Sequence, residues 1–167
     1  EQRQAEEALR QSEEKFAHAF SGSPDALVIS RIADRVIVEI NQGFSDFTGY
    51  SREEVRGRSP QDLGLWHDPK DRLRLYEAIE RHGRCDQLEA LFRCKDGTML
   101  VGLLSARLIL IQKEPHLISS IHDITQRKQD EADLQRLRVA IEHAAEVIVV
   151  TDAGGNILYA NPAFEQV

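Results

Sequence analysis

The chain has 167 residues, of which 41% are apolar and 29% charged, and its net charge is −7. This balance is typical of a globular protein, because it is too rich in large apolar residues for a disordered chain and too charged for a membrane protein. The acidic excess argues against binding to duplex nucleic acid. We find no run of about 18 apolar residues that could span a bilayer and no signal peptide. We therefore expect a cytoplasmic protein whose segment here contacts neither membrane nor nucleic acid.

The sequence predicts neither a metal site nor a catalytic centre. Cys85 and Cys94 are too few for a disulfide framework or a zinc site, and we expect both to be reduced thiols. The six histidines are scattered, with no pair at the spacing of metal ligands. No nucleophile elbow or other catalytic constellation is found. We therefore expect that this segment is not an enzyme.

The first third of the chain predicts a helix, a hairpin and two short helices. Residues 3–20 carry small and apolar side chains at heptad spacing, which suits either a helix packed on its own domain or a two-stranded coiled coil. Residues 26–30 and 36–40 are rich in Val and Ile and predict a β-hairpin. A short helix is expected at 43–48. The Ser-x-x-Glu sequence at 51–54 is a capping box that opens another helix.

The middle of the chain predicts a longer helix and three strands. The helix spans 69–82, with Pro69 in its first turn. Its expected buried side is Leu73, Leu75, Tyr76 and Ile79. The strands are expected at 87–94, 99–111 and 116–124. A tight turn at 95–97 separates the first two strands, and a turn at 112–115 separates the last two.

A charged helix is expected from residue 126 to about residue 143, with Thr125 as its N-cap. Its apolar side chains repeat the heptad spacing of the first helix; they are Leu134, Leu137, Ile141 and Ala144.

The end of the chain repeats its beginning. Asn161 and Phe164 match Asn41 and Phe44, and both pairs are 120 residues apart. A second copy of the domain therefore begins near residue 145, and with the strands it has it cannot bury a core alone.

Three motifs resemble the PAS domain with its C-terminal PAC motif. They are NQGFSDFTGYSREEVRGRS at 41–59, RCKDGTML at 93–100 and HDITQRK at 122–128. The resemblance implies an α+β fold, with a five-stranded antiparallel sheet in the order 2-1-5-4-3 and helices on one face. It divides the chain into an N-terminal linker helix (1–22), a PAS/PAC domain (23–125), a signalling linker helix (126–144) and the start of a second PAS domain (145–167).

PAS domains are sensory or dimerisation modules. The resemblance therefore implies an input module that relays a signal through helical linkers to a separate output domain. We expect that output to be a sensor histidine kinase, with a cyclic-di-GMP synthase or phosphodiesterase as the alternative. A ligand-free module for dimerisation and relay is a further alternative. The expected partners are a second copy of the chain, through the linker helices, and the output domain in the same polypeptide.

The resemblance also locates the cofactor contacts of the family, and this chain lacks them. Flavin-binding members carry a reactive cysteine and amide side chains where this chain has Pro60, Phe92, Gly102 and Ile121. Haem-binding members need an axial histidine, and the matching position is about Leu73. We therefore predict no flavin, no haem and a colourless protein. A packed core and a pocket for an unknown small molecule remain as alternatives.

The expected pocket is mostly apolar. Its residues are Val28, Ser30, Phe44, Phe47, Leu65, Trp66, Leu75, Ile79, Phe92, Leu104 and Ile121. Ser30 is the only clear polar group in this set, whereas ligand sites carry several that converge.

The expected relay is the junction between the last strand and the charged helix. It consists of Asp123, Ile124, Thr125 and Arg127. We expect the Thr125 hydroxyl to cap the helix, and the Asp123 carboxylate to face the positive helix end and Arg127.

Overall fold

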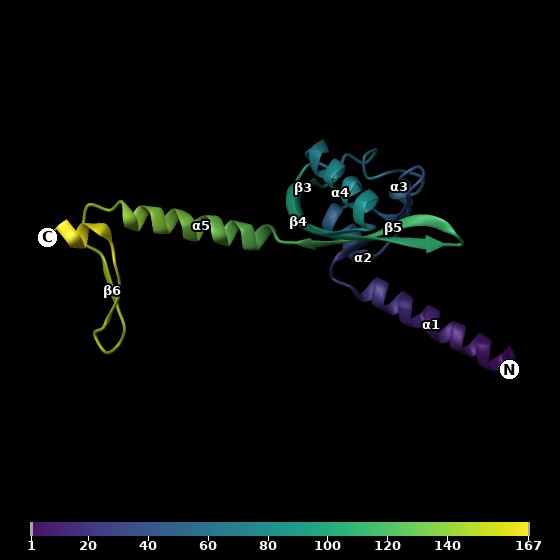
Figure 1. Ribbon diagram of the computed structural model, residues 1–167, viewed down its shortest axis with the longest axis horizontal. Coiled ribbons are helices and arrows are strands. Elements are labelled where there is room, and N and C mark those ends of the chain that lie inside the picture. The colour runs from purple at the N-terminus through teal and green to yellow at the C-terminus, as the bar shows by residue number, and fades with distance from the viewer. Residues whose placement is uncertain (1, 167) are drawn as a thin grey trace. The chain divides into compact units, whose positions relative to one another are not determined.

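The computed structural model describes residues 2–166, and the chain divides at Thr125 into two compact units. The first unit holds a five-stranded sheet with its helices, and the second holds most of one helix and a small hairpin (Figure 1).

Four helices belong to the first unit. They are α1 (Gln2–Gly22), α2 (Gln42–Thr48), α3 (Arg52–Val55) and α4 (Pro69–His82). The capping box of α3 is confirmed, because the Ser51 hydroxyl accepts the N–H of Glu54 while the Glu54 carboxylate accepts the N–H of Ser51. Gly83 ends α4 at φ 67°, a left-handed conformation that costs glycine little.

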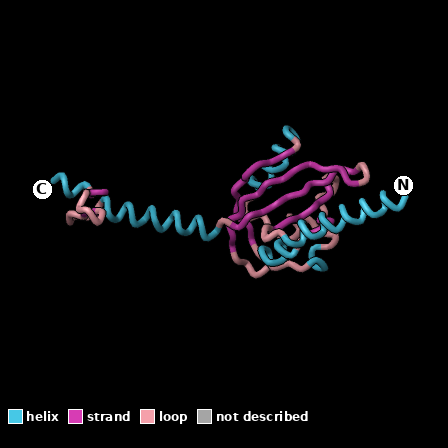
Figure 2. Tube along the Cα trace, turned by 90° about the horizontal axis from the view of Figure 1, so that it is seen from below, coloured by secondary structure: helices cyan, strands magenta, loops and turns pink. Residues whose placement is uncertain are grey.

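The strands of the first unit form one antiparallel sheet. They are β1 (Ala26–Arg31), β2 (Ile37–Ile40), β3 (Arg84–Arg93), β4 (Met99–Ile111) and β5 (Glu114–Asp123). Their order is β2-β1-β5-β4-β3, which confirms the predicted order. Figure 2 shows the strands side by side, and Figure 1 shows α3 and α4 on one side of them.

Two predicted boundaries in this sheet are wrong. The third strand begins at Arg84 rather than at residue 87, because a bulge between Cys85 and Leu88 absorbs the irregular stretch and Gln87 takes φ 51° there. The turn after β4 has two residues rather than four: Gln112 and Lys113 both have positive φ, as in the tight hairpin turns that match strand twist.

The core lies between the inner face of the sheet and helices α2 to α4. Leu75 and Ile79 of α4 pack into it. Leu73 does not, and its side chain is 54% exposed. The prediction that Leu73 is buried is wrong, because Leu73 lies on the side of α4 opposite the buried Leu75.

The second unit contains α5 (Thr125–Glu142) from residue 126 onward, β6 (Val149–Thr151), β7 (Ile157–Ala160) and the short helix η1 (Pro162–Gln166). β6 and β7 form an antiparallel hairpin. Within residues 2–166, no helix is both long enough and apolar enough to cross a membrane.

Candidate functional site

A central cavity of about 40 Å³ lies between the sheet and α4. Its lining is Val28, Ser30, Phe44, Pro60, Leu65, Trp66, Tyr76, Phe92, Leu104, Ser119 and Ile121. Phe47, Leu75 and Ile79 are buried in the core but do not line this cavity. A space of this size admits a few water molecules at most.

The ring of Phe92 is buried against two other aromatic rings. It lies 5.1 Å from the ring of Trp66 and 5.9 Å from that of Phe47, measured between centroids. Gly102 on β4 makes room for it, because a Cβ at Gly102 would lie 2.7 Å from Phe92 Cε2 and 2.5 Å from Ile121 Cγ2. The absence of a side chain at Gly102 therefore lets the Phe92 ring approach the backbone of β4 closely.

Three residues with a hydroxyl group belong to the cavity lining: Ser30, Ser119 and Tyr76. Both serines are buried. Burial also raises the pKa of Tyr76, so its hydroxyl stays neutral. The sequence reasoning missed Ser119, although Leu117, Ser119 and Ile121 alternate on the inner face of β5 with a period of two.

The cavity does not fit a flavin or a haem. The positions at which the PAS resemblance locates amide or thiol contacts to a flavin hold Pro60, Phe92, Gly102 and Ile121, which offer neither. The position matched to an axial haem ligand is Leu73, on the outer side of α4. Over the described range, 2–166, no three His, Cys, Asp or Glu side chains are grouped to hold a metal ion.

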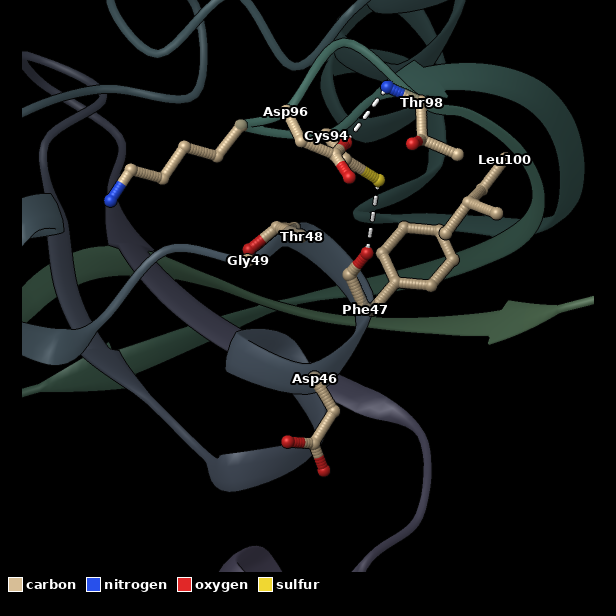
Figure 3. A pocket seen from close by; sticks show the side chains of 9 residues that line it. Asp46, Phe47, Thr48, Gly49, Cys94, Asp96, Thr98 and Leu100 are labelled. Atoms are coloured by element: carbon tan, nitrogen blue, oxygen red, sulfur yellow. Dashed lines mark hydrogen bonds between the residues drawn. The ribbon is translucent and has the colours of Figure 1, made fainter.

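A second, open cleft of about 470 Å³ lies between the end of α2 and the β3–β4 hairpin (Figure 3). The Cys94 thiol points across it and donates to the carbonyl of Phe47 at 3.1 Å. The Asp96 carboxylate accepts the N–H of Thr98 at 2.8 Å, and the Thr48 hydroxyl donates to the carbonyl of Phe44. The Cys94 bond fastens the hairpin to α2, whereas the other two bonds lie within the hairpin and within α2. We assign no ligand to this cleft.

Both cysteines are free thiols. Burial raises the pKa of Cys85 and of Cys94, and the nearby carboxylates of Asp86 and Asp96 raise them further. A thiol is nucleophilic only as thiolate, so the raised pKa lowers the reactivity of both residues at neutral pH.

The junction between β5 and α5 is tied to the edge of β4 at Val101. The N–H of Val101 donates to the Thr125 hydroxyl at 2.9 Å, and the carbonyl of Val101 accepts the N–H of Ile124 at 2.9 Å. The Asp123 carboxylate accepts both the N–H of Thr125 at 2.9 Å and its hydroxyl proton at 2.6 Å. Ile124 is buried between these contacts.

This geometry corrects one expectation for the junction. Thr125 is the first residue of α5 rather than the residue before it. Its hydroxyl accepts the N–H of Val101 in the sheet. The Asp123 carboxylate, and not the Thr125 hydroxyl, accepts the first backbone N–H of the helix. Arg127 belongs to the second unit, and its contact with Asp123 stays a prediction.

The start of β1, where the chain enters the sheet, lies beside the end of β5, where the chain leaves it. β1 begins at Ala26, which faces Ile121 near the end of β5. The Asp25 carboxylate is 2.7 Å from Nδ1 of His122. The end of α1 and the start of α5 therefore adjoin the same end of two neighbouring central strands.

The comparisons with known proteins agree with this architecture. A family model described as PAS domain matches residues 24–126, and a second PAS-domain model matches residues 135–167. The chain is 31% identical over 137 residues to the methyl sulfide methyltransferase-associated sensor of Methanosarcina acetivorans, over 80% of this chain and 13% of that protein. It is 27% identical over 141 residues to the sensor histidine kinase TmoS of Ectopseudomonas mendocina, over 78% of this chain and 14% of that protein.

Among solved structures, the PAS domain of an HTR-like protein from Haloarcula marismortui superposes with a TM-score of 0.60 at 24% identity. The match covers 73% of this chain and 99% of that one, and it supports the fold. The chain spans only 13–14% of the length of the two curated relatives.

Proposed function

Because the chain belongs to the PAS-domain family, we propose that it is an input module that relays a signal through α5 to a separate output domain, a sensor histidine kinase. The observation that carries this proposal is the set of bonds that joins Val101, Asp123 and Thr125 at the start of α5.

The path from the core to the helix is short. Ile121 lines the central cavity, and Asp123, two residues further along β5, holds the first N–H of α5. Thr125 is bonded to the neighbouring strand, so a shift between β4 and β5 moves the first residue of the helix directly. A population shift between two sheet arrangements would therefore change how α5 leaves the domain.

The two curated relatives support the choice of output. One relative is a sensor and the other a sensor histidine kinase, and each is several times longer than the matched region. A cyclic-di-GMP synthase or phosphodiesterase is the alternative output, and the proposed relay would act on it through the same helix.

A relay that needs no bound ligand is the second candidate function, and the small size of the central cavity favours it. Its volume is about 40 Å³, and the Phe92 ring already packs under the sheet. Native mass spectrometry of the purified chain separates the two candidates. A mass equal to the bare chain supports the ligand-free relay, whereas a retained small molecule in stoichiometric amount supports ligand sensing.

We propose a second copy of the chain as partner, through the linker helices. Leu9 and Phe16 of α1 are 61% and 56% exposed, and Leu134 and Leu137 of α5 are 67% and 61% exposed, at heptad spacing. Light scattering of the intact chain and of Leu9→Glu/Phe16→Glu tests this. A dimeric mass that the double variant loses supports it, and a monomeric mass for the unchanged chain refutes it.

The direct test of the relay uses the longer protein that we propose carries this module. Asp123→Ala removes the acceptor of the Thr125 N–H and hydroxyl. Asp46→Ala is the matched control, because the exposed Asp46 carboxylate accepts a surface bond from Gln42 within α2. We expect Asp123→Ala to change the basal rate or the signal response of autophosphorylation, and Asp46→Ala to leave both unchanged. Wild-type behaviour of Asp123→Ala would refute the relay.

A further inference from the structure

Asn41 ties the end of α1 to the first hairpin. The side chain is 4% exposed. Its Nδ2 donates to the carbonyl of Phe20 at 3.0 Å and to that of Asp25 at 2.9 Å, and its Oδ1 accepts the N–H of Leu27 at 2.8 Å. Phe20 lies in the last turn of α1, where helical carbonyls have no partner within the helix. Asn41 therefore fixes how the helix end meets β1.

Asn161 makes the matching bonds at the end of α5. Its Nδ2 donates to the carbonyl of Ile141 at 3.1 Å and to that of Glu146 at 2.9 Å, and its Oδ1 accepts the N–H of Ile148 at 2.9 Å. Ile141 lies in the last turn of α5. Each of these three partners lies 121 residues after the corresponding partner of Asn41, one residue more than the 120 that separate the two asparagines.

Asn161 is far more buried than its neighbours in the second unit. Among the side chains described between residues 126 and 165, it is the only one that is buried, at 1% exposure. The apolar residues of the same hairpin are open, with Ile157 58% and Leu158 66% exposed. The three bonds of this buried side chain therefore join the last turn of α5 to the hairpin.

We propose that Asn41 and Asn161 are two copies of one coupling device, in which a buried asparagine holds the last turn of the incoming helix against the hairpin that follows. The helix α5 is then held at its start by Asp123 and Thr125 and at its end by Asn161. Asn161 is a positioning residue that receives the movement of α5 and passes it to the next copy. This inference rests on the proposed relay function.

The first arm of the test measures the device itself in the 167-residue chain. Asn161→Asp keeps an oxygen that accepts the Ile148 N–H but removes both donors and sets a charge against two carbonyl oxygens. Gln135→Glu adds the same charge on an exposed residue of α5 and is the matched control. We expect amide hydrogen exchange in residues 139–142 to rise about tenfold or more in Asn161→Asp and to stay unchanged in the control. Unchanged exchange in Asn161→Asp would overturn the device whatever the function.

The second arm measures autophosphorylation of the longer protein with Asp123→Ala, Asn161→Asp and both. If Asn161 acts downstream on the same path, the double variant changes output no more than the larger single change. Two results would show that Asn161 has a purely structural role: effects of the two changes on output that multiply, or no effect of Asn161→Asp where Asp123→Ala has one. Either result would overturn the inference and leave the proposed function standing. An inert Asp123→Ala would refute the proposed function instead.

Discussion

The contact between Gly102 and Phe92 predicts a strong, non-additive effect on stability. In Gly102→Ala the new Cβ would lie 2.7 Å from the Phe92 ring and 2.5 Å from Ile121. Ordinary carbon contacts are about 3.5–4.0 Å, so both side chains must move by roughly 1 Å. Overpacking of this kind costs about 1–3 kcal/mol. We expect the upper half of that range, because both neighbours are buried on adjoining strands.

A double-mutant cycle tests whether the two side chains interact, and its second variant is Phe92→Ala. Phe92 is 3% exposed and contacts the rings of Trp66 and Phe47, so its truncation should cost about 3–5 kcal/mol. In the double variant the added methyl enters space that the ring has left, and only the contact with Ile121 remains short. We expect the double variant to be about 1–2 kcal/mol more stable than the sum of the single changes predicts.

Urea unfolding measures the cycle, with fluorescence of the single tryptophan, Trp66, and far-ultraviolet circular dichroism as two probes. Where Phe92→Ala leaves too little stability to measure, Phe92→Leu replaces it. Gly22→Ala is the control, because a Cβ there meets no atom within 4 Å. A Gly102→Ala variant as stable as the unchanged chain, or strictly additive changes in the double variant, would refute the packing described for Phe92.

The remaining predictions concern the thiols, the second unit and colour. Cys85 and Cys94 should react with iodoacetamide at neutral pH much more slowly in the folded than in the urea-unfolded chain, because burial raises the pKa of both; equal rates would contradict this. A chain that ends at Gln135 keeps the whole first unit and should still melt cooperatively, so loss of the transition would show that the second unit is required. The purified protein should show no visible absorption band, and a stoichiometric flavin or Soret band would disprove the prediction.

The sequence was sufficient for the order of elements and, through the family resemblance, for the strand order. Local rules identified the capping box at Ser51 and the start of α4 at Pro69 because each depends on residues within one turn of the helix. The boundaries of β3 and of the β4–β5 turn were wrong. In both places the chain adopts positive φ at residues other than glycine, Gln87 and Lys113 among them, and composition gives no signal for that.

The site was predicted less completely, because its contacts join residues far apart in the chain. The Thr125 hydroxyl bonds to Val101, 24 residues earlier, and a capping rule that considers only the helix assigns that hydroxyl to the wrong partner. The packing of Phe92 against Gly102 depends on the register of β3 and β4, which places Ala90 opposite Gly102. The internal repeat of Asn41 at Asn161 was visible in the sequence, but the bonds of the two side chains were not.

The central claim, that movement of the sheet reaches α5 through the bonds of Thr125, is tested most directly by Thr125→Val. This change replaces the hydroxyl with a methyl group of similar size, so the Val101 N–H loses its acceptor and Asp123 loses one of its two donors. Thr98→Val is the control, because the Thr98 side chain is exposed at the hairpin tip. The measurement is signal-dependent autophosphorylation of the longer protein. We predict an altered basal rate or response for Thr125→Val alone; wild-type values for both variants would contradict the account.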